Sequence, residues 1–180
     1  MRWKKYDKDA PHAYTFGVFP TLELLRHQTR RVVEVLLHSQ GERNEGIDKI
    51  IALCDHARIP CTLDDKQVER LSPKENTYAV GVFQKYYPKL DPATNHLVLV
   101  NPGDMGNLGT TIRTMLGFGV GNLALIRPAV DIFDPRAVRA SMGATFQLAF
   151  DYFDSFEAYR AAFEAHHLYP FMTDGTVSLP

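Results

Sequence analysis

One glycine-rich stretch of the sequence holds residue types suited to binding an oxygen-rich group. Residues 101–120 read NPGDMGNLGTTIRTMLGFGV and contain a single cation, Arg113. Glycine lets a backbone approach a ligand closely, and a guanidinium matches the geometry of phosphate. Two interpretations follow from the residues alone: a loop that handles phosphate, or a structural turn followed by a helix with a solvated arginine.

A second stretch, residues 127–146, combines arginines with a small polar turn. It reads RPAVDIFDPRAVRASMGATF. Asp134 is typical of a helix N-cap, and Arg136 and Arg139 fall three apart, on one helical face. Ser141 follows at a point where backbone amides could face an anion. This stretch is therefore a second candidate for contact with phosphate.

The densest basic cluster lies near the N-terminus and consists of Arg26, His27, Arg30 and Arg31. The simplest interpretation is a solvated helix end. The sharper hypothesis is a patch for an RNA backbone, since electrostatic docking to RNA requires such patches.

The cysteines do not indicate a metal site. Cys54, His56 and Cys61 have a spacing that fits no common zinc pattern, and Cys54 falls on the apolar face of a predicted helix. The two cysteines imply no disulfide framework, so we expect a reducing cytoplasm.

Composition excludes several classes of protein. The chain has 180 residues, a formal net charge of −1 and a pI near 6.6. Net charge gives no support for nucleic-acid binding, so any RNA site must be a local patch. The N-terminus lacks the apolar run of a signal peptide, and no apolar stretch reaches the length of a membrane span.

The helices and strands that carry these residues are predicted to form two α/β domains. The first half reads α-β-α-β-α-β, with helices near 21–30, 47–57 and 64–71 and strands near 31–39, 59–63 and 78–86. The second half starts with a short apolar strand at 96–100, of the kind found in parallel sheets. A helix from about Thr110 and a strand at 122–126 complete a β-loop-α-β unit, and open parallel sheets bind ligands at the carboxyl ends of their strands.

Further elements are expected toward the C-terminus: a strand at 147–153, a helix at 154–167 and a strand at 168–174. Prolines and turn formers in YYPKLDPATNH mark a linker. We therefore expect a first domain over 1–87, a linker over 88–96 and a second domain over 97–180.

The two stretches together resemble a known family. GNLGTTIRT and DPRAVRASMGATF look like the first two motifs of SpoU/TrmH-type RNA ribose methyltransferases, which belong to the SPOUT class. The N-terminal half is similar to the L30e-like substrate-binding domain that many of these enzymes carry, including Asn76 shortly before AVGV. The resemblance implies an L30e-like α/β domain followed by a partial SPOUT-type parallel-sheet domain.

The resemblance also implies an activity. Such enzymes transfer a methyl group from S-adenosylmethionine to a ribose 2′-hydroxyl of rRNA or tRNA, usually as homodimers. Arg113 and Asn107 match the family's catalytic motif, and Arg139 and Ser141 match positions that contact RNA or shape the site. Arg113 acts either as a base or as an electrostatic stabiliser, and the second role suits a guanidinium that stays protonated.

The sequence departs from the family at its end. After DGTVSLP it shows neither the Gly-x-Glu loop nor the Ser-Leu-Asn stretch of the third motif. We therefore expect a fragmentary member without the knot segment, and no cofactor-binding residues can be named. The sequence leaves open whether the chain is active. The alternative is a non-catalytic RNA-binding module with a vestigial methyltransferase domain, and a generic nucleotide-binding βαβ domain is a weaker third interpretation.

Overall fold

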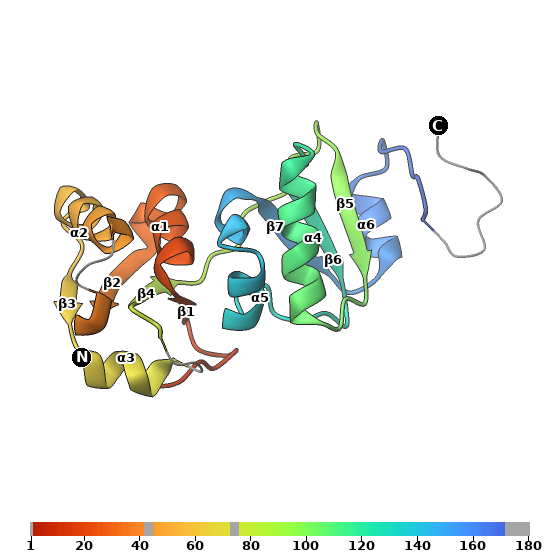
Figure 1. Cartoon of the computed structure of the whole chain (residues 1–180). Helices are drawn as coiled ribbons and strands as arrows, with labels where there is room; N and C mark the ends of the chain where they lie inside the picture. The colour runs from red at the N-terminus through yellow and green to blue at the C-terminus, as the bar shows by residue number, and fades with distance from the viewer. Residues whose placement is uncertain (1, 42–44, 73–75, 172–180) are drawn as a thin grey trace.

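A computed structural model describes residues 2–41, 45–72 and 76–171. The described chain forms two α/β units side by side, each built on its own sheet (Figure 1). The first sheet has the strand order β1-β4-β2-β3, and the second has the order β5-β6-β7. Within these residues no helix is both long enough and apolar enough to span a membrane.

The first sheet is mixed. β4 runs antiparallel to both β1 and β2, whereas β2 and β3 are parallel. Its strands are β1 (His12–Phe16), β2 (Val32–Leu37), β3 (Cys61–Leu63) and β4 (Ala79–Gln84). The connecting helices are α1 (Val18–His27), η1 (Thr29–Arg31), η2 (Ser39–Gly41), α2 (Glu45–Ala57) and α3 (Asp65–Leu71).

Most elements predicted for this unit are confirmed, and one was missed. α2, α3, β2, β3 and β4 lie where the apolar patterns placed them. β1 was not predicted, because HAYTF is short and buries its last four residues, so it lacks the alternation that marks a half-exposed strand. α1 begins at Val18, three residues earlier than expected.

The second sheet is parallel throughout, as predicted. Its strands are β5 (His96–Val100), β6 (Asn122–Ile126) and β7 (Ala149–Phe153). The other elements are α4 (Met105–Gly117), α5 (Pro135–Ala140), η3 (Ala144–Gln147) and α6 (Phe156–Ala162). Leu123 and Leu125 of β6 pack in one cluster with Ile112 of α4, whereas Ala124 and Ile126 pack with Tyr159 of α6. α4 and α6 therefore cover opposite faces of the sheet, as Figure 1 shows.

The glycine-rich stretch is mostly helix, which corrects the expected loop. α4 begins at Met105 rather than near Thr110, because the carboxylate of Asp104 accepts a hydrogen bond from the backbone N–H of Asn107 at 2.7 Å and caps the helix. Gly106 and Gly109 consequently lie inside α4. Arg113 is in its third turn, about 12 Å along the axis from Met105, and not beside the loop mouth.

The two units share one hydrophobic core. The ring of Phe83, on β4, lies 5.5 Å from that of Phe133 and 5.2 Å from that of Phe146, both in the second unit. Residues 85–95 between the units form no helix or strand, yet Tyr86 and Leu90 are buried. The connection is thus packed against the protein rather than extended into solvent.

The helix predicted at 154–167 is only partly confirmed, and the strand predicted at 168–174 is not confirmed. α6 ends at Ala162, short of the expected 167. Of the strand predicted at 168–174, residues 168–171 form no strand, and the rest lies outside the described residues, as does the VSLP stretch at 177–180.

A candidate RNA-modifying site at the contact of α4 and α5

A close contact between α4 and α5 organises the candidate site. A Cβ at Gly109 would lie 2.5 Å from the Cβ of Ala140 and 2.6 Å from the backbone N of Ser141. Real Cβ atoms do not approach neighbours so closely, so only glycine fits at this point. The glycine that the sequence suggested as a loop residue is therefore a helix-packing residue.

Arg113 and Arg139 flank this contact. Arg113 lies one helical turn beyond Gly109 and on the same face of α4, and Arg139 directly precedes Ala140. Both side chains are exposed, and neither has a hydrogen bond or an ion pair to any residue in the described part of the chain. The contact therefore brings two unengaged guanidinium groups to one side of the unit.

The neighbouring Arg136 is engaged instead. Its guanidinium donates two hydrogen bonds to Asp134, from Nε at 3.0 Å and from Nη2 at 2.9 Å. Burial opposes ionisation of Asp134, but the hydrogen bonds and charge of Arg136 outweigh it and lower the pKa of this carboxyl. Asp134 also caps α5 through the backbone N–H of Arg136, as predicted. Of the two arginines singled out on α5, only Arg139 is free to bind a ligand.

Asn107 and Arg113 are not brought together. They are six residues apart on α4, so their side chains point about 120° apart and are offset by about 9 Å along the axis. The Asn107 side chain is exposed, and its backbone N–H is occupied by the helix cap. A shared role for these two residues stays a prediction.

Ser141 requires a correction. It was expected to contact RNA or shape the site, but its side chain is fully buried. Its hydroxyl donates to the carbonyl of Val138 at 2.8 Å and accepts from Thr145 at 3.0 Å. Direct contact with RNA is excluded in this arrangement, because no surface of the residue is exposed. Ser141 instead stabilises the turn between α5 and η3.

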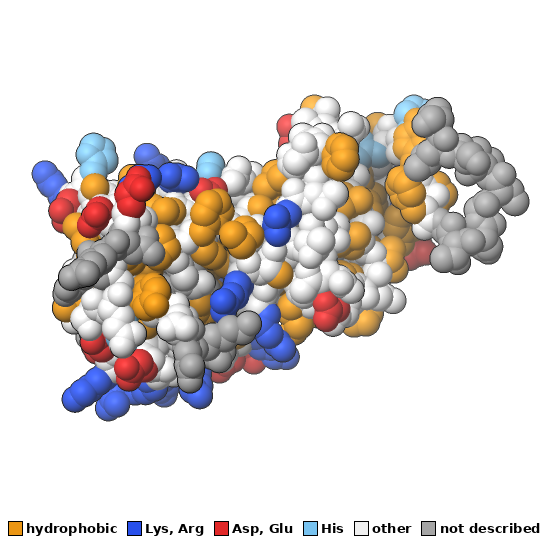
Figure 2. All heavy atoms as spheres, viewed as in Figure 1, with side chains coloured by type: hydrophobic (Ala, Val, Ile, Leu, Met, Phe, Trp, Pro, Cys, Tyr) orange, Lys and Arg blue, Asp and Glu red, His pale blue; other side chains and the backbone are white. Residues whose placement is uncertain are grey.

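The basic cluster of the first unit reaches the same region. Gln28, at the end of α1, donates to the carbonyl of Phe146 at 2.9 Å, and Gln147 donates to Glu23 at 2.8 Å. η3 packs against both α1 and α4. The predicted RNA patch therefore lies beside the second unit, and Figure 2 shows Lys and Arg side chains around the junction.

The three arginines of this cluster differ in what they contact. Arg26 forms an ion pair with Glu23 at 2.9 Å. Arg31 lies over the ring of Tyr86, with Cζ 5.8 Å from its centroid. Arg30 is exposed and has no such partner among the described residues. Arg30 is therefore the member of the cluster most available to a phosphate.

Two polar contacts between the units were not predicted from the sequence. Glu23 is buried and accepts hydrogen bonds from both units. Asp131 accepts a hydrogen bond from Tyr6 and forms an ion pair with Lys85 at 3.3 Å. Burial, followed by the bond to Asp131, raises the pKa of Tyr6. Gln147 is 124 residues from Glu23, and Asp131 is 125 residues from Tyr6 and 46 from Lys85, so no local pattern pairs them.

Within the described residues, no group of three His, Cys, Asp or Glu side chains is placed to hold a metal ion. Cys54 and Cys61 are both free thiols.

Comparison with known proteins finds a family match in the second unit. Residues 94–178 match the SpoU rRNA Methylase family. The mitochondrial rRNA methyltransferase 3 of Xenopus laevis is 38% identical over 80 residues, which cover 38% of this chain and 19% of that protein. The 23S rRNA (uridine(2479)-2′-O)-methyltransferase of Streptomyces viridochromogenes is 26% identical over 127 residues, which cover 71% of this chain and 36% of the relative.

A solved structure supports the same fold. The SpoU methyltransferase AviRb from Streptomyces viridochromogenes, in complex with the cofactor AdoMet, superposes with a TM-score of 0.71 at 19% identity. The match covers 88% of this chain and 62% of that one. In all three comparisons the chain spans less than two thirds of the other protein's length. Residues 94–178 of this chain are thus similar to SpoU-type methylases, in keeping with the predicted resemblance, and the superposition confirms the expected α/β fold.

Proposed function

We propose that this chain belongs to an RNA methyltransferase that transfers a methyl group from S-adenosylmethionine to a ribose 2′-hydroxyl of rRNA or tRNA. The observation that carries the proposal is the α4–α5 contact at Gly109, which presents Arg113 and Arg139 without internal partners. An exposed arginine that no acidic residue neutralises is available to a phosphate. The contact lies in the segment that matches the SpoU family.

The chemistry needs charge stabilisation more than a strong base. Methyl transfer forms a bond between the ribose oxygen and the methyl carbon, breaks the bond from that carbon to sulfur, and releases the hydroxyl proton. Negative charge develops on the oxygen as the proton leaves, and a fixed cation nearby stabilises it. Arg113 stays protonated, so we assign it this electrostatic role, with Arg139 holding an adjacent phosphate. We assign no residue of this chain to the cofactor, which supplies the methyl group when it is bound.

Methyl transfer to RNA tests the proposal directly. The purified chain would be mixed with ribosomal RNA or tRNA and S-adenosylmethionine labelled on its methyl group, and digestion to nucleosides would locate the label. We expect label on the ribose 2′-oxygen. Label on a base would overturn the proposed reaction. RNA binding without any transfer by the full natural protein would favour the alternative, a non-catalytic RNA-binding module.

Assembly and location follow from the same proposal. We propose that the protein acts as a homodimer in a reducing cytoplasm, in keeping with the family resemblance and two free cysteines. Light scattering coupled to gel filtration measures the first point, and a mass of about one chain would contradict it.

A further inference from the structure

The first unit contains a polar cavity of about 350 Å³ that the candidate site does not use. It lies between the turn that follows β2, the second half of α3 and the residues before β4, and Figure 1 shows α3 apart from α4. β2 separates it by about 20 Å from Arg30 and Arg31, at the strand's other end. The cavity is therefore distinct from the region where α4 and α5 meet.

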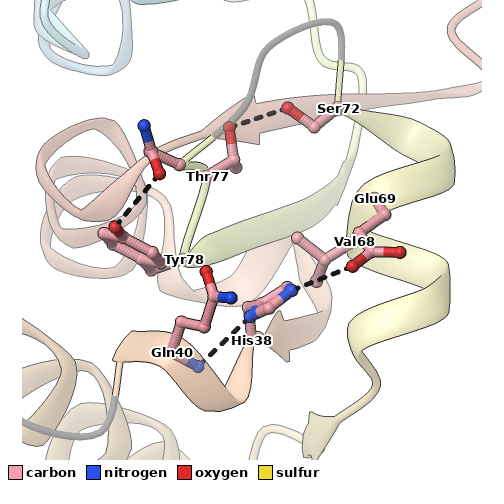
Figure 3. A pocket seen from close by; sticks show the side chains of 8 residues that line it. His38, Gln40, Val68, Glu69, Ser72, Thr77 and Tyr78 are labelled. Atoms are coloured by element: carbon pink, nitrogen blue, oxygen red, sulfur yellow. Dashed lines mark hydrogen bonds and ion pairs between the residues drawn. The ribbon is translucent and has the colours of Figure 1, made fainter.

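The walls of the cavity suit a flat ring. Figure 3 shows the ring of Tyr78 on one side and Val68 with Glu69 on the other. His38 and Gln40 lie at one end, and the hydrogen-bonded pair Ser72 and Thr77, 2.7 Å apart, lies at the other. An aromatic wall opposite an aliphatic one is the setting in which unstacked bases of single-stranded RNA are held.

The hydrogen bonds of His38 determine what the cavity offers to a ligand. The backbone N–H of Gln40 donates to His38 Nδ1 at 3.2 Å, so this nitrogen is an acceptor and carries no proton. The proton is therefore on Nε2, which donates to Oε1 of Glu69 at 3.3 Å. His38 is nearly buried, and it thus holds one oxygen of an exposed carboxylate in place.

The remaining hydrogen-bonding capacity matches one base edge. Oε2 of Glu69 and the side-chain amide of Gln40 have no hydrogen-bond partner among the described residues, and Figure 3 shows the amide directed toward the centre of the cavity. A carboxylate only accepts hydrogen bonds, and it can accept two from adjacent donors. The Watson–Crick edge of guanine presents two adjacent donors, N1–H and the N2 amino group, next to the acceptor O6. Adenine presents one donor and one acceptor there instead.

We propose that this cavity binds an unpaired guanine base of the RNA substrate. Glu69 accepts from the N1 and N2 donors through Oε2 and the remaining lone pair of Oε1, the Gln40 amide donates to O6, and Tyr78 stacks on the ring. The inference rests on the proposed function for its RNA partner, and it adds a base-reading contact to the phosphate contacts at the α4–α5 junction. Phosphate contacts position a nucleic acid, whereas base contacts specify its sequence.

Nucleosides test the cavity without relying on RNA binding or catalysis. Guanosine, inosine and adenosine would each be titrated into the full chain, with the His38 ring and the Tyr78 amide followed by NMR. We expect guanosine to shift both signals, inosine to bind more weakly because it lacks the N2 amino group, and adenosine to leave them unchanged. Equal responses to guanosine and adenosine, or none to either, would overturn the inference.

A second arm uses RNA and matched variants. The heptamers UUUGUUU and UUUAUUU differ in one base, and we expect the first to bind on the order of tenfold more tightly, the scale of one bidentate base contact. Glu69→Gln should abolish this preference, whereas Glu164→Gln, an exposed acid in the second unit, should keep it. If Glu69→Gln only lowers the thermal midpoint and leaves the preference intact, the His38–Glu69 bond is structural and the inference fails.

The two proposals fail in different ways. Loss of guanosine selectivity with normal methyl transfer removes the cavity's role and leaves the proposed function standing. Guanosine selectivity without methyl transfer does the reverse. Preferential binding of an arginine-containing peptide in place of guanosine would also overturn the inference, because the carboxylate would then serve a protein partner.

Discussion

The two units present different kinds of polar surface. The first unit has a polar cavity with a buried histidine, a carboxylate and an aromatic wall. The second has exposed arginines at a helix–helix contact and no carboxylate that neutralises Arg113 or Arg139 among the described residues. The first arrangement selects a ligand by shape and hydrogen bonds, and the second attracts phosphate by charge.

The difference shows how a chain of almost zero net charge can still present local positive charge. With a formal charge of −1, the whole protein attracts no polyanion. Its acidic residues neutralise some arginines, such as Arg26 and Arg136, and leave others free. The unpaired arginines therefore concentrate positive charge at a few places on the surface. The shared core of the two units fixes the positions of these arginines.

The largest expected effect comes from breaking the core that joins the two kinds of contact. Phe146→Ala removes a fully buried ring that packs on Phe83 across the units, and we expect a loss of about 3–5 kcal/mol in the free energy of unfolding. Denaturation followed by the fluorescence of Trp3, in the first unit, should show the loss. Phe118→Ala, at a residue that is 83% exposed, is the control. An unchanged Trp3 transition in Phe146→Ala would mean that the units unfold independently.

Replacing the Arg113 guanidinium should leave the fold intact and impair catalysis. Arg113→Ala and Arg113→Lys should both reduce methyl transfer on the order of 10²–10³-fold, the scale for losing one preorganised stabiliser of developing charge. Single-turnover transfer measures the effect. Thr114→Ala, at the next exposed position of α4, serves as the matched control. Near-normal turnover in Arg113→Ala would support the plain interpretation of a solvated helix residue.

Separating α4 from α5 should affect the second unit through geometry rather than charge. Gly109→Ala places a Cβ within 3 Å of the Ala140 Cβ, the Ser141 backbone N and the Ala137 carbonyl oxygen. Overpacking of this kind costs about 1–3 kcal/mol. Thermal unfolding and methyl transfer should both decline. Gly117→Ala is the control, because a Cβ there meets nothing within 4 Å and should be neutral or slightly stabilising. Equal stabilities for the two variants would contradict the packing role of Gly109.

The smallest effect is expected at the basic cluster of the first unit. Arg30→Ala should weaken RNA binding and reduce the slope of log affinity against log salt by about 0.7–0.9, the value of one phosphate contact. Lys89→Ala, at an exposed position between the units, should not change the slope. If Arg30→Ala leaves the slope as it is, Arg30 makes no phosphate contact.

Periodicity and caps predicted much of the fold. The parallel strands at 96–100 and 122–126 and the N-cap at Asp134 were found because buried parallel strands read as unbroken apolar runs and caps need a small polar acceptor. The start of α4 was placed too late because the glycines were read as loop formers, although Asp104 carries the capping signal three residues before Asn107. Glycine serves both for turns and for close helix packing, and the sequence does not distinguish these uses.

The sequence also predicted some features of the candidate site and not others. The motif residues Arg113 and Arg139 could be named from the sequence, since their types and spacing carry the family resemblance. Ser141 could not be judged, because a serine in such a turn can face an anion or be buried, and only the packing against Val138 and Thr145 decides this. The cavity of the first unit had no sequence signal, since its walls come from the turn after β2, from α3 and from the residues before β4.

The sequence by itself determined the family resemblance, the parallel arrangement of the second sheet and the two arginines of the motifs, because these depend on local spacing along one segment. The tertiary structure alone decided which cations remain free, which serine is buried and how the two units are joined. Those properties depend on contacts such as Glu23 with Gln147 and Tyr6 with Asp131, which join residues more than a hundred positions apart. The free energy of such contacts depends on burial and geometry that exist only once the whole chain has folded.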